Sequence, residues 1–270
     1  MAPDPCFFRT PTPASLQGRA EINEFDPPRS EAPAPATAPD PETPALPSLP
    51  ARIVQVFFSP GDLFQALRHA PGWGLGALVV GALLAAIGVL VPGLFGLEAF
   101  EETIRDSMVE AGQDVPADVS TWALVSWTVG VAAAAIFWPV VAVLSAGLYA
   151  LVFLFLFGYE GSFRQLLNIT AHALLVPAVA AVLLIPLRVV TGDFTASLTA
   201  AAFFPFLEDG FLLTLLTFTD LFNLWCYALV GLGAALMDGR KSVGQGVTIS
   251  VATALIITVV VAAVVNAFSG

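Results

Sequence analysis

The chain has 270 residues, of which 57% are hydrophobic and only 11% are charged, and its formal net charge is −11. A soluble domain usually carries about 25% charged residues, and several apolar runs here exceed the roughly 18 residues that mark a membrane-crossing helix. This composition excludes an ordinary soluble protein, and the acidic balance excludes a nucleic-acid-binding protein.

The first region, residues 1–50, is rich in proline and alanine and carries three arginines against seven acidic residues. It shows no apolar periodicity, and a segment with so little apolar surface cannot offset the entropy that folding removes. We predict a disordered tail over residues 1–50, followed by a membrane domain over residues 51–270. The tail is either a solvated extension or a docking segment for a partner protein.

A short helix is predicted to lead into the first span. Ser59, Pro60 and Asp62 have the pattern of a helix start, with a capping serine, a first-turn proline and an acid at the third position. The following residues place apolar side chains on one face, and we expect this amphipathic helix to lie along the membrane surface. The first span then covers residues 73–95. Its glycines favour close packing against other helices: Gly74, Gly76, Gly81 and Gly88.

The next two segments differ sharply in charge. Residues 98–111 repeat an apolar side chain every fourth position among acidic residues, which predicts an amphipathic helix on a membrane surface. Residues 121–157 hold no charged residue across 37 positions. A single helix of this length would measure about 55 Å, against roughly 30 Å of hydrocarbon. The run is therefore either one helix that overshoots the bilayer or two helices that meet at Pro139.

The positive-inside rule decides between these alternatives. With one helix, five basic residues share one side of the membrane: Arg52, Arg68, Arg164, Arg240 and Lys241. With two helices, three of the five move to the opposite side and the bias reverses. A transmembrane helix also tolerates a lone proline as a kink. We therefore predict an all-α bundle with the N-terminus cytoplasmic and the C-terminus outside. Its five transmembrane helices span residues 73–95, 121–157, 163–190, 220–237 and 243–268.

Three stretches resemble the bacterial branch of the Yip1 family of five-span membrane proteins. Residues 59–64 and 71–73 are similar to its Pro-x-x-x-Phe and Pro-x-Trp lead-in to the first span. Residues 161–177 are similar to its Gly-x-Phe-Lys motif before a Tyr-Ala-x-x-Pro helix, with His172 where tyrosine is usual. Residues 220–225 match its Asp-x-Phe-x-x-Trp span. The resemblance implies a role in membrane organisation or trafficking and a place in the bacterial cytoplasmic membrane.

Polar and ionisable groups inside a membrane are costly, so they are the first candidates for function. Arg164, Asn168 and His172 fall four residues apart and form a polar stripe on one helix. Asp220 either caps its helix or acts as a functional carboxylate. His172 belongs either to a hydrogen-bonded cluster that holds the bundle together or to a proton-linked site. The full candidate set is Arg164, Asn168, His172, Asp220, Asn223, Tyr149 and Tyr227.

Three classes of function follow from this pattern. No nucleophile elbow, phosphate-binding loop or zinc-protease motif appears, and we predict no enzyme activity, no cofactor and no metal site. A non-enzymatic membrane scaffold or interaction protein fits best, with the lipid bilayer and either another protein or a second copy of the chain as partners. The alternative is a small-solute or ion transporter or channel, which requires a polar path from Arg164 to Asp220. An intramembrane enzyme is the third class.

Overall fold

The structure, a computed structural model, describes residues 46–69, 72–116, 118–193, 196–207 and 210–269. Its helices in chain order are α1 (Leu49–Phe58), α2 (Pro60–His69), α3 (Leu75–Phe95), α4 (Leu97–Glu110), α5 (Val119–Ala150), the π-helix η1 (Leu151–Leu156), α6 (Phe163–Ala173), α7 (Leu175–Leu183), α8 (Ile185–Thr191), the 3-10 helix η2 (Ala200–Phe203), α9 (Phe211–Thr217), α10 (Leu221–Asp238) and α11 (Val243–Ser269).

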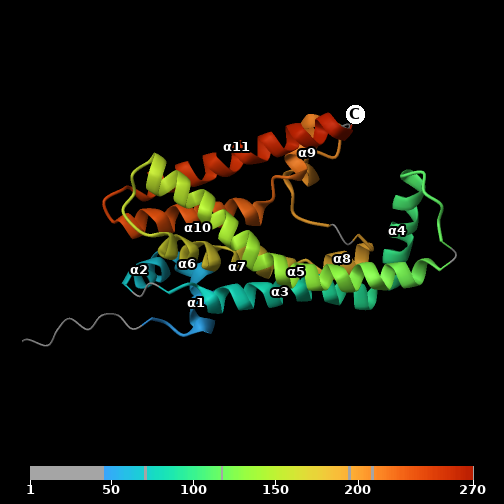
Figure 1. The fold of residues 1–270 in the computed structure, drawn as a ribbon, viewed down its shortest axis with the longest axis horizontal. Coiled ribbons are helices and arrows are strands. Elements are labelled where there is room, and N and C mark those ends of the chain that lie inside the picture. Colours follow the sequence, from blue (N-terminus) through green and yellow to red (C-terminus); the bar gives the residue numbers. More distant parts are fainter. Residues whose placement is uncertain (1–45, 70–71, 117, 194–195, 208–209, 270) are drawn as a thin grey trace, which may run out of the picture. The chain divides into compact units, whose positions relative to one another are not determined.

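Five helical segments within the described residues are long and apolar enough to cross a membrane (Figure 1). They are Leu75–Phe95, Val119–Leu156, Phe163–Thr191, Leu221–Asp238 and Val243–Phe268. The predicted all-α bundle of five spans is therefore confirmed, and the chain is a multi-pass membrane protein. The predicted division between tail and membrane domain stays a prediction, because residues 1–45 lie outside the described residues; α1 begins at Leu49.

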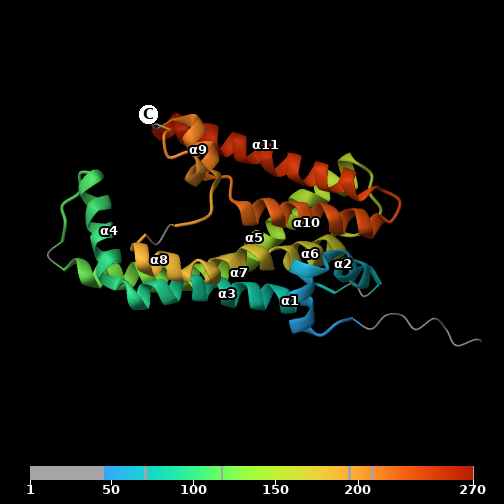
Figure 2. The same cartoon turned by 180° about the vertical axis from the view of Figure 1, so that it is seen from behind.

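The long apolar run is one span. Val119–Leu156 forms a continuous helical segment of 38 residues, α5 followed directly by η1, so the two-helix alternative is wrong. Pro139 lies inside α5, where it cannot donate a hydrogen bond to the carbonyl four residues earlier. The ribbon of α5 changes direction part-way along its length in both views (Figures 1 and 2). A bend of this kind is the usual effect of an interior proline.

Large indole rings on α5 lie against bare backbone on α3. A Cβ built on Gly81 would collide with the indole nitrogen of Trp138, and a Cβ on Gly93 would collide with that of Trp127. Since the later tryptophan meets the earlier glycine, the two helices run in opposite directions. Glycine supplies here the close approach that the sequence predicted for this span. Gly88, another of the predicted packing glycines, lies in the same way against Ala181 of α7.

The third span is built from three helical pieces. Breaks at Leu174 and Leu184 separate α6, α7 and α8, and Pro177 and Pro186 lie in the first turns of the second and third pieces. Proline is tolerated there because first-turn N–H groups have no partner within the helix. Ser162 starts α6 with a capping box in which it exchanges hydrogen bonds with Gln165.

The last two spans pack closely against each other. A Cβ on Gly231 of α10 would lie 2.6 Å from Val247 Cα and would collide with the carbonyl oxygen of Gly246 on α11. Backbone therefore touches backbone at this crossing, as in other membrane helix pairs with small residues at the interface. α9 packs beside α11, and α2 packs its apolar face on α10 and α6. The buried residues of α2 are Leu63, Phe64 and Leu67. The predicted apolar face is therefore present and packs against the bundle, while the predicted place of this helix on the membrane surface stays a prediction.

Candidate functional site

His172 connects α6, the first part of the third span, to Arg52 on α1. Its side chain is completely buried, with Nδ1 2.8 Å from the Asn168 carbonyl oxygen and Nε2 3.3 Å from Arg52 Nη1. A guanidinium group can only donate, so Nε2 accepts and Nδ1 carries the proton that it donates to Asn168. The imidazole is therefore neutral in this arrangement. Asn168 is itself buried on the same face, one helical turn away.

The tyrosine candidates meet at a serine that the sequence analysis left out. Ser250 of α11 is fully buried, and its hydroxyl donates to the backbone carbonyl of Tyr227 at 2.7 Å. The Tyr149 side chain on α5 lies close to the same serine. The Ser250 hydroxyl thus links α11 to α10, and Tyr227 takes part through its backbone. A functional role for Tyr149 and Tyr227 stays a prediction.

Asp220 is the N-cap of α10. Its Oδ1 accepts hydrogen bonds from the backbone N–H groups of Phe222 at 2.8 Å and Asn223 at 3.0 Å. These bonds satisfy donors that have no partner within the helix. Asn223 is half-buried in the first turn of that helix. Among the described residues no hydrogen bond connects this pair with His172, so the described hydrogen bonds do not form a continuous polar path between them.

Arg164 lies at the surface of the bundle, where α6 begins. Its guanidinium carbon is 5.3 Å from the centre of the Trp73 ring, within the range of a cation–π contact. The arginine side chain is exposed, and Trp73 is 48% exposed. The stripe of Arg164, Asn168 and His172 therefore runs from the exposed start of α6 to its buried middle.

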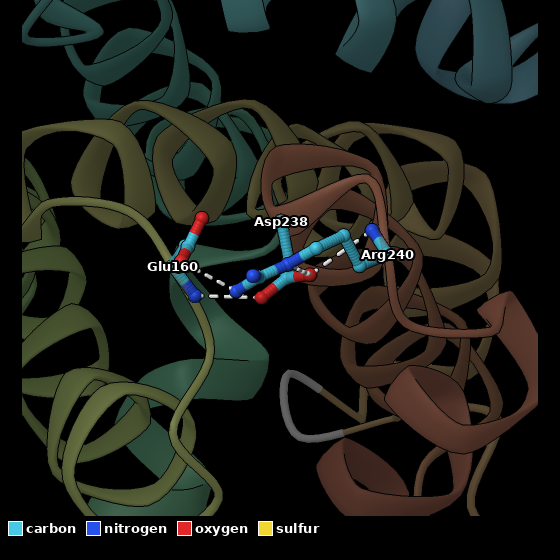
Figure 3. A network of polar contacts seen from close by, with 3 residues as sticks. All are labelled: Glu160, Asp238 and Arg240. Carbon is cyan, nitrogen blue, oxygen red and sulfur yellow. Dashed lines mark hydrogen bonds and ion pairs between the residues drawn. The ribbon is translucent and has the colours of Figure 1, made fainter.

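Asp238, which was not among the candidates, connects the loop before α6 with the turn between α10 and α11 (Figure 3). Asp238 Oδ2 accepts from the backbone N–H of Glu160 at 2.6 Å, and Oδ1 accepts from that of Arg240 at 3.0 Å. Arg240 Nη2 in turn lies 2.6 Å from Glu160 Oε1. The side chain of Asp238 is inaccessible to solvent. An aspartate followed by glycine is typical of a turn, but its partner Glu160 lies 78 residues away and could not be predicted from the sequence.

Aromatic and basic side chains surround this connection. Tyr159 is buried against Phe153, with ring centres 4.9 Å apart, and Lys241 Nζ lies 5.5 Å from the Tyr159 ring centre. Burial raises the pKa of Tyr159, and the negative charge of Asp238 raises it further. Arg68 reaches the turn from α2, because a Cβ on Gly239 would lie 2.7 Å from its Nη2. Three cations thus gather around Gly239, and we name Arg68, Arg240 and Lys241 the Gly239 cluster.

Comparison with known protein families identifies the chain. Residues 54–265 match the sequence model of a family described as the Yip1 domain. The chain belongs to the Yip1 domain family. The match extends from α1 to α11 and includes every predicted candidate residue. No curated protein and no solved structure matches the chain.

Two of the stretches that carry the resemblance start helices of this Yip1 domain. Residues 161–165 hold the capping box and Arg164, and residues 220–225 begin with the aspartate that caps α10. His172, in the stretch of residues 161–177, contacts Arg52 of α1. Within the described residues no group of three or more histidine, cysteine or acidic side chains is placed to hold a metal ion. The residues of these motifs therefore cap α6 and α10 and hold α6 against α1.

Arg188 is a further polar residue within a span of this Yip1 domain. Pro92 has no backbone N–H, so the carbonyl of Gly88 lacks its donor four residues on. Arg188 Nη1 lies 3.3 Å from that oxygen and donates to it, while Nε donates to the Ala196 carbonyl at 3.1 Å. The side chain lines a cavity of about 220 Å³ together with Pro92. Arg188 thus replaces the hydrogen bond that the proline removes from α3.

A double-mutant cycle tests this replacement. We expect Arg188→Met to lower the free energy of unfolding by about 1–2 kcal/mol in the natural background. In a chain that also carries Pro92→Ala the loss is expected to be smaller, because alanine restores the missing donor. Unfolding in mixed detergent micelles, followed by circular dichroism, measures both differences. An equal loss in the two backgrounds would show that Arg188 acts through other contacts.

Proposed function

We propose that this protein is a non-enzymatic membrane scaffold or interaction protein of the bacterial cytoplasmic membrane. The proposal rests on how the buried polar groups are used. His172 binds Arg52, Ser250 bonds to the Tyr227 carbonyl, and the half-buried Asp220 caps its own helix. Each of these interactions holds two helices together or closes a helix end. Polar groups that are used to hold helices together are not available to bind a solute along a transport path. This use therefore supports a scaffold more than a transporter.

The proposed orientation places the N-terminal side of α1 in the cytoplasm and the end of α11 outside. It is supported by the gathering of basic side chains at one end of the bundle, where Arg68 meets Gly239 and Arg164 meets Trp73. Basic residues in short loops favour the cytoplasmic side. At the opposite end, α4 carries five acidic side chains and one arginine over Leu97–Glu110, a balance that the rule permits outside.

The partners that we propose are the lipid bilayer together with another protein, bound through residues 1–50, or a second copy of the chain. Large apolar side chains remain exposed along the spans, for example Leu144 at 67% and Ile256 at 64%. Exposed apolar surface of this extent is suited to lipid or to another transmembrane helix. The N-terminal segment carries a net negative charge, which favours a basic protein partner over an anionic surface.

Flux measurements separate the scaffold from the transporter. We expect vesicles that contain the purified protein to be no more permeable to protons, ions or small solutes than protein-free vesicles. Asp220→Asn preserves the capping function, because asparagine caps as well as aspartate, and His172→Phe removes the buried imidazole. If the wild-type protein conducts and these variants remain folded but lose the flux, the scaffold proposal is wrong.

Affinity capture tests the interaction directly. The full chain and a chain that lacks residues 1–45, which keeps the whole of α1, are each captured in mild detergent and compared by quantitative mass spectrometry. We expect at least one partner to be enriched with both the wild-type chain and His172→Phe. Loss of that partner with the shortened chain assigns docking to the N-terminal segment. Retention assigns it to the membrane domain, and absence of any specific partner or self-association contradicts the proposal.

A further inference from the structure

Positive charge at the α2 end of the bundle exceeds the acidic groups available to neutralise it. Arg240 is paired, with its Nη2 2.6 Å from Glu160 and its Nε 3.6 Å from Asp238. Among the described residues, no carboxylate lies within ion-pair distance of Arg68 or Lys241. Two cations without a direct ion pair therefore remain in the Gly239 cluster, and Lys241 interacts with the Asp238 carboxylate only at longer range. An unpaired cation at the edge of a membrane is a receptor for an anion.

Arg68 is held in place without an acidic partner. It lies in the last turn of α2, just before His69, and the apolar face of α2 is anchored in the bundle by the buried Leu63, Phe64 and Leu67. The guanidinium group lies over Gly239, where a Cβ would be 2.8 Å from its Cζ. Gly239 ends α10 in the left-handed conformation, with φ 75°. The negative end of the α10 dipole accounts for part of the attraction, but the exposed side of the guanidinium remains open.

Lys241 is held from the opposite side of the same turn. Its ammonium group lies over the Tyr159 ring, and Tyr159 is only 4% exposed, so the ring is a fixed support. Asp238 fixes the turn itself, because its buried carboxylate binds the backbone of both Glu160 and Arg240. Figure 3 shows the Asp238 carboxylate between those two residues. The positions of both free cations are therefore set before any ligand arrives, which lowers the entropic cost of binding.

We propose that the Gly239 cluster binds the phosphate group of an anionic phospholipid. Its charge is complementary to phosphate, and arginine and lysine are the residues that bind phosphate in proteins. The cluster lies where α10 ends and α11 begins, so a headgroup there can keep its acyl chains against the exposed apolar side chains of α11. Trp73 with Arg164 above it lies at the same end of the bundle, as interfacial tryptophans do. This site goes beyond the scaffold function and does not depend on it.

Lipid adducts on the purified full-length protein test the site. The probes are phosphatidylglycerol and phosphatidylcholine with identical acyl chains, titrated in mild detergent and measured by native mass spectrometry. We expect the wild type to favour phosphatidylglycerol, and Arg68→Gln with Lys241→Gln to reduce that preference by about tenfold or more. Arg68→Lys with Lys241→Arg keeps the charges and is expected to keep the preference. Arg105→Gln, which removes an exposed cation from α4, is the matched control and is expected to change nothing.

Three outcomes overturn the proposal. The first is equal binding of the two lipids by the wild type. The second is an equal loss of preference with Arg105→Gln and with the double glutamine variant. The third is displacement of the lipid by millimolar inorganic phosphate, which would make this a site for free phosphate. If the glutamine variant does not fold, the wild-type preference is measured against salt concentration. A decline with salt supports the site, because screening weakens contacts between exposed charges, and an unchanged preference contradicts it.

Discussion

Gly246→Ala is expected to be among the most damaging single-methyl changes in the chain. The new Cβ would lie 2.9 Å from the Ala235 Cβ and would collide with the carbonyl oxygen of Gly231. A backbone atom cannot rotate away as a side chain can, so α10 and α11 must separate. Overpacking of this kind costs about 1–3 kcal/mol, and more where backbone must move. Unfolding in mixed micelles, followed by circular dichroism, measures the loss.

Gly244→Ala is the matched control for this prediction. Gly244 lies two residues earlier on the same helix, and a Cβ there would meet no atom within 4 Å. Because alanine favours a helix more than glycine does, this variant is expected to be neutral or to gain up to about 1 kcal/mol. If the two variants lose stability equally, close approach of α10 and α11 is not the cause, and the described crossing would be incorrect.

Asp238→Ala is expected to destabilise the protein by about 2–4 kcal/mol. The change leaves the backbone N–H groups of Glu160 and Arg240 without their acceptor, and each such group costs about 1–3 kcal/mol when it stays buried. It also removes one of the two carboxylates beside the Arg240 guanidinium. Urea or mixed-micelle unfolding measures the change. Hydrogen exchange at Glu160 and Arg240 is expected to accelerate in the same variant.

Glu160→Ala provides the contrast within the same network. The Glu160 side chain is 67% exposed although it lies only 2.6 Å from Arg240, and exposed ion pairs contribute about 0–1 kcal/mol. The buried acceptor is therefore expected to contribute more than the exposed ion pair, although both include a contact of 2.6 Å. A larger loss with Glu160→Ala than with Asp238→Ala would reverse this order. It would show that the ion pair, and not the buried carboxylate, holds the two loops together.

Features that depend on neighbouring residues could be predicted from the sequence. Hydropathy located the five spans, the Ser59–Pro60 pattern located the start of α2, and the residues flanking Asp220 indicated its capping role. The choice of one helix over two for residues 121–157 followed from the distribution of basic residues and from the tolerance of a transmembrane helix for one proline. Each of these features is fixed within a few turns of one helix, or by the bilayer thickness, which is the same for every chain.

Contacts between distant residues could not be predicted in this way. Arg52 and His172 are 120 positions apart, and Glu160 and Asp238 are 78 apart. Asp238 looks like an ordinary turn residue because its burial depends on a loop from another part of the chain. Ser250 and Arg188 were missed for a similar reason. Ser250 donates to the backbone carbonyl of Tyr227 on α10, and Arg188 donates to the Gly88 carbonyl on α3 that Pro92 leaves without its helical donor. A single sequence carries no record of these pairings.

The contact between Arg68 and Gly239 also has a consequence for the parity of membrane crossings. Two residues can meet at one membrane face only if an even number of spans separates them, and four spans lie between Arg68 and Gly239. Glu160 and Arg240 obey the same condition with two spans between them. The lead-in to the first span and both of these loops must therefore share one face, whichever face it is. Labelling any one of them fixes the sidedness of all three, and it places the end of α11, one crossing further on, at the opposite face.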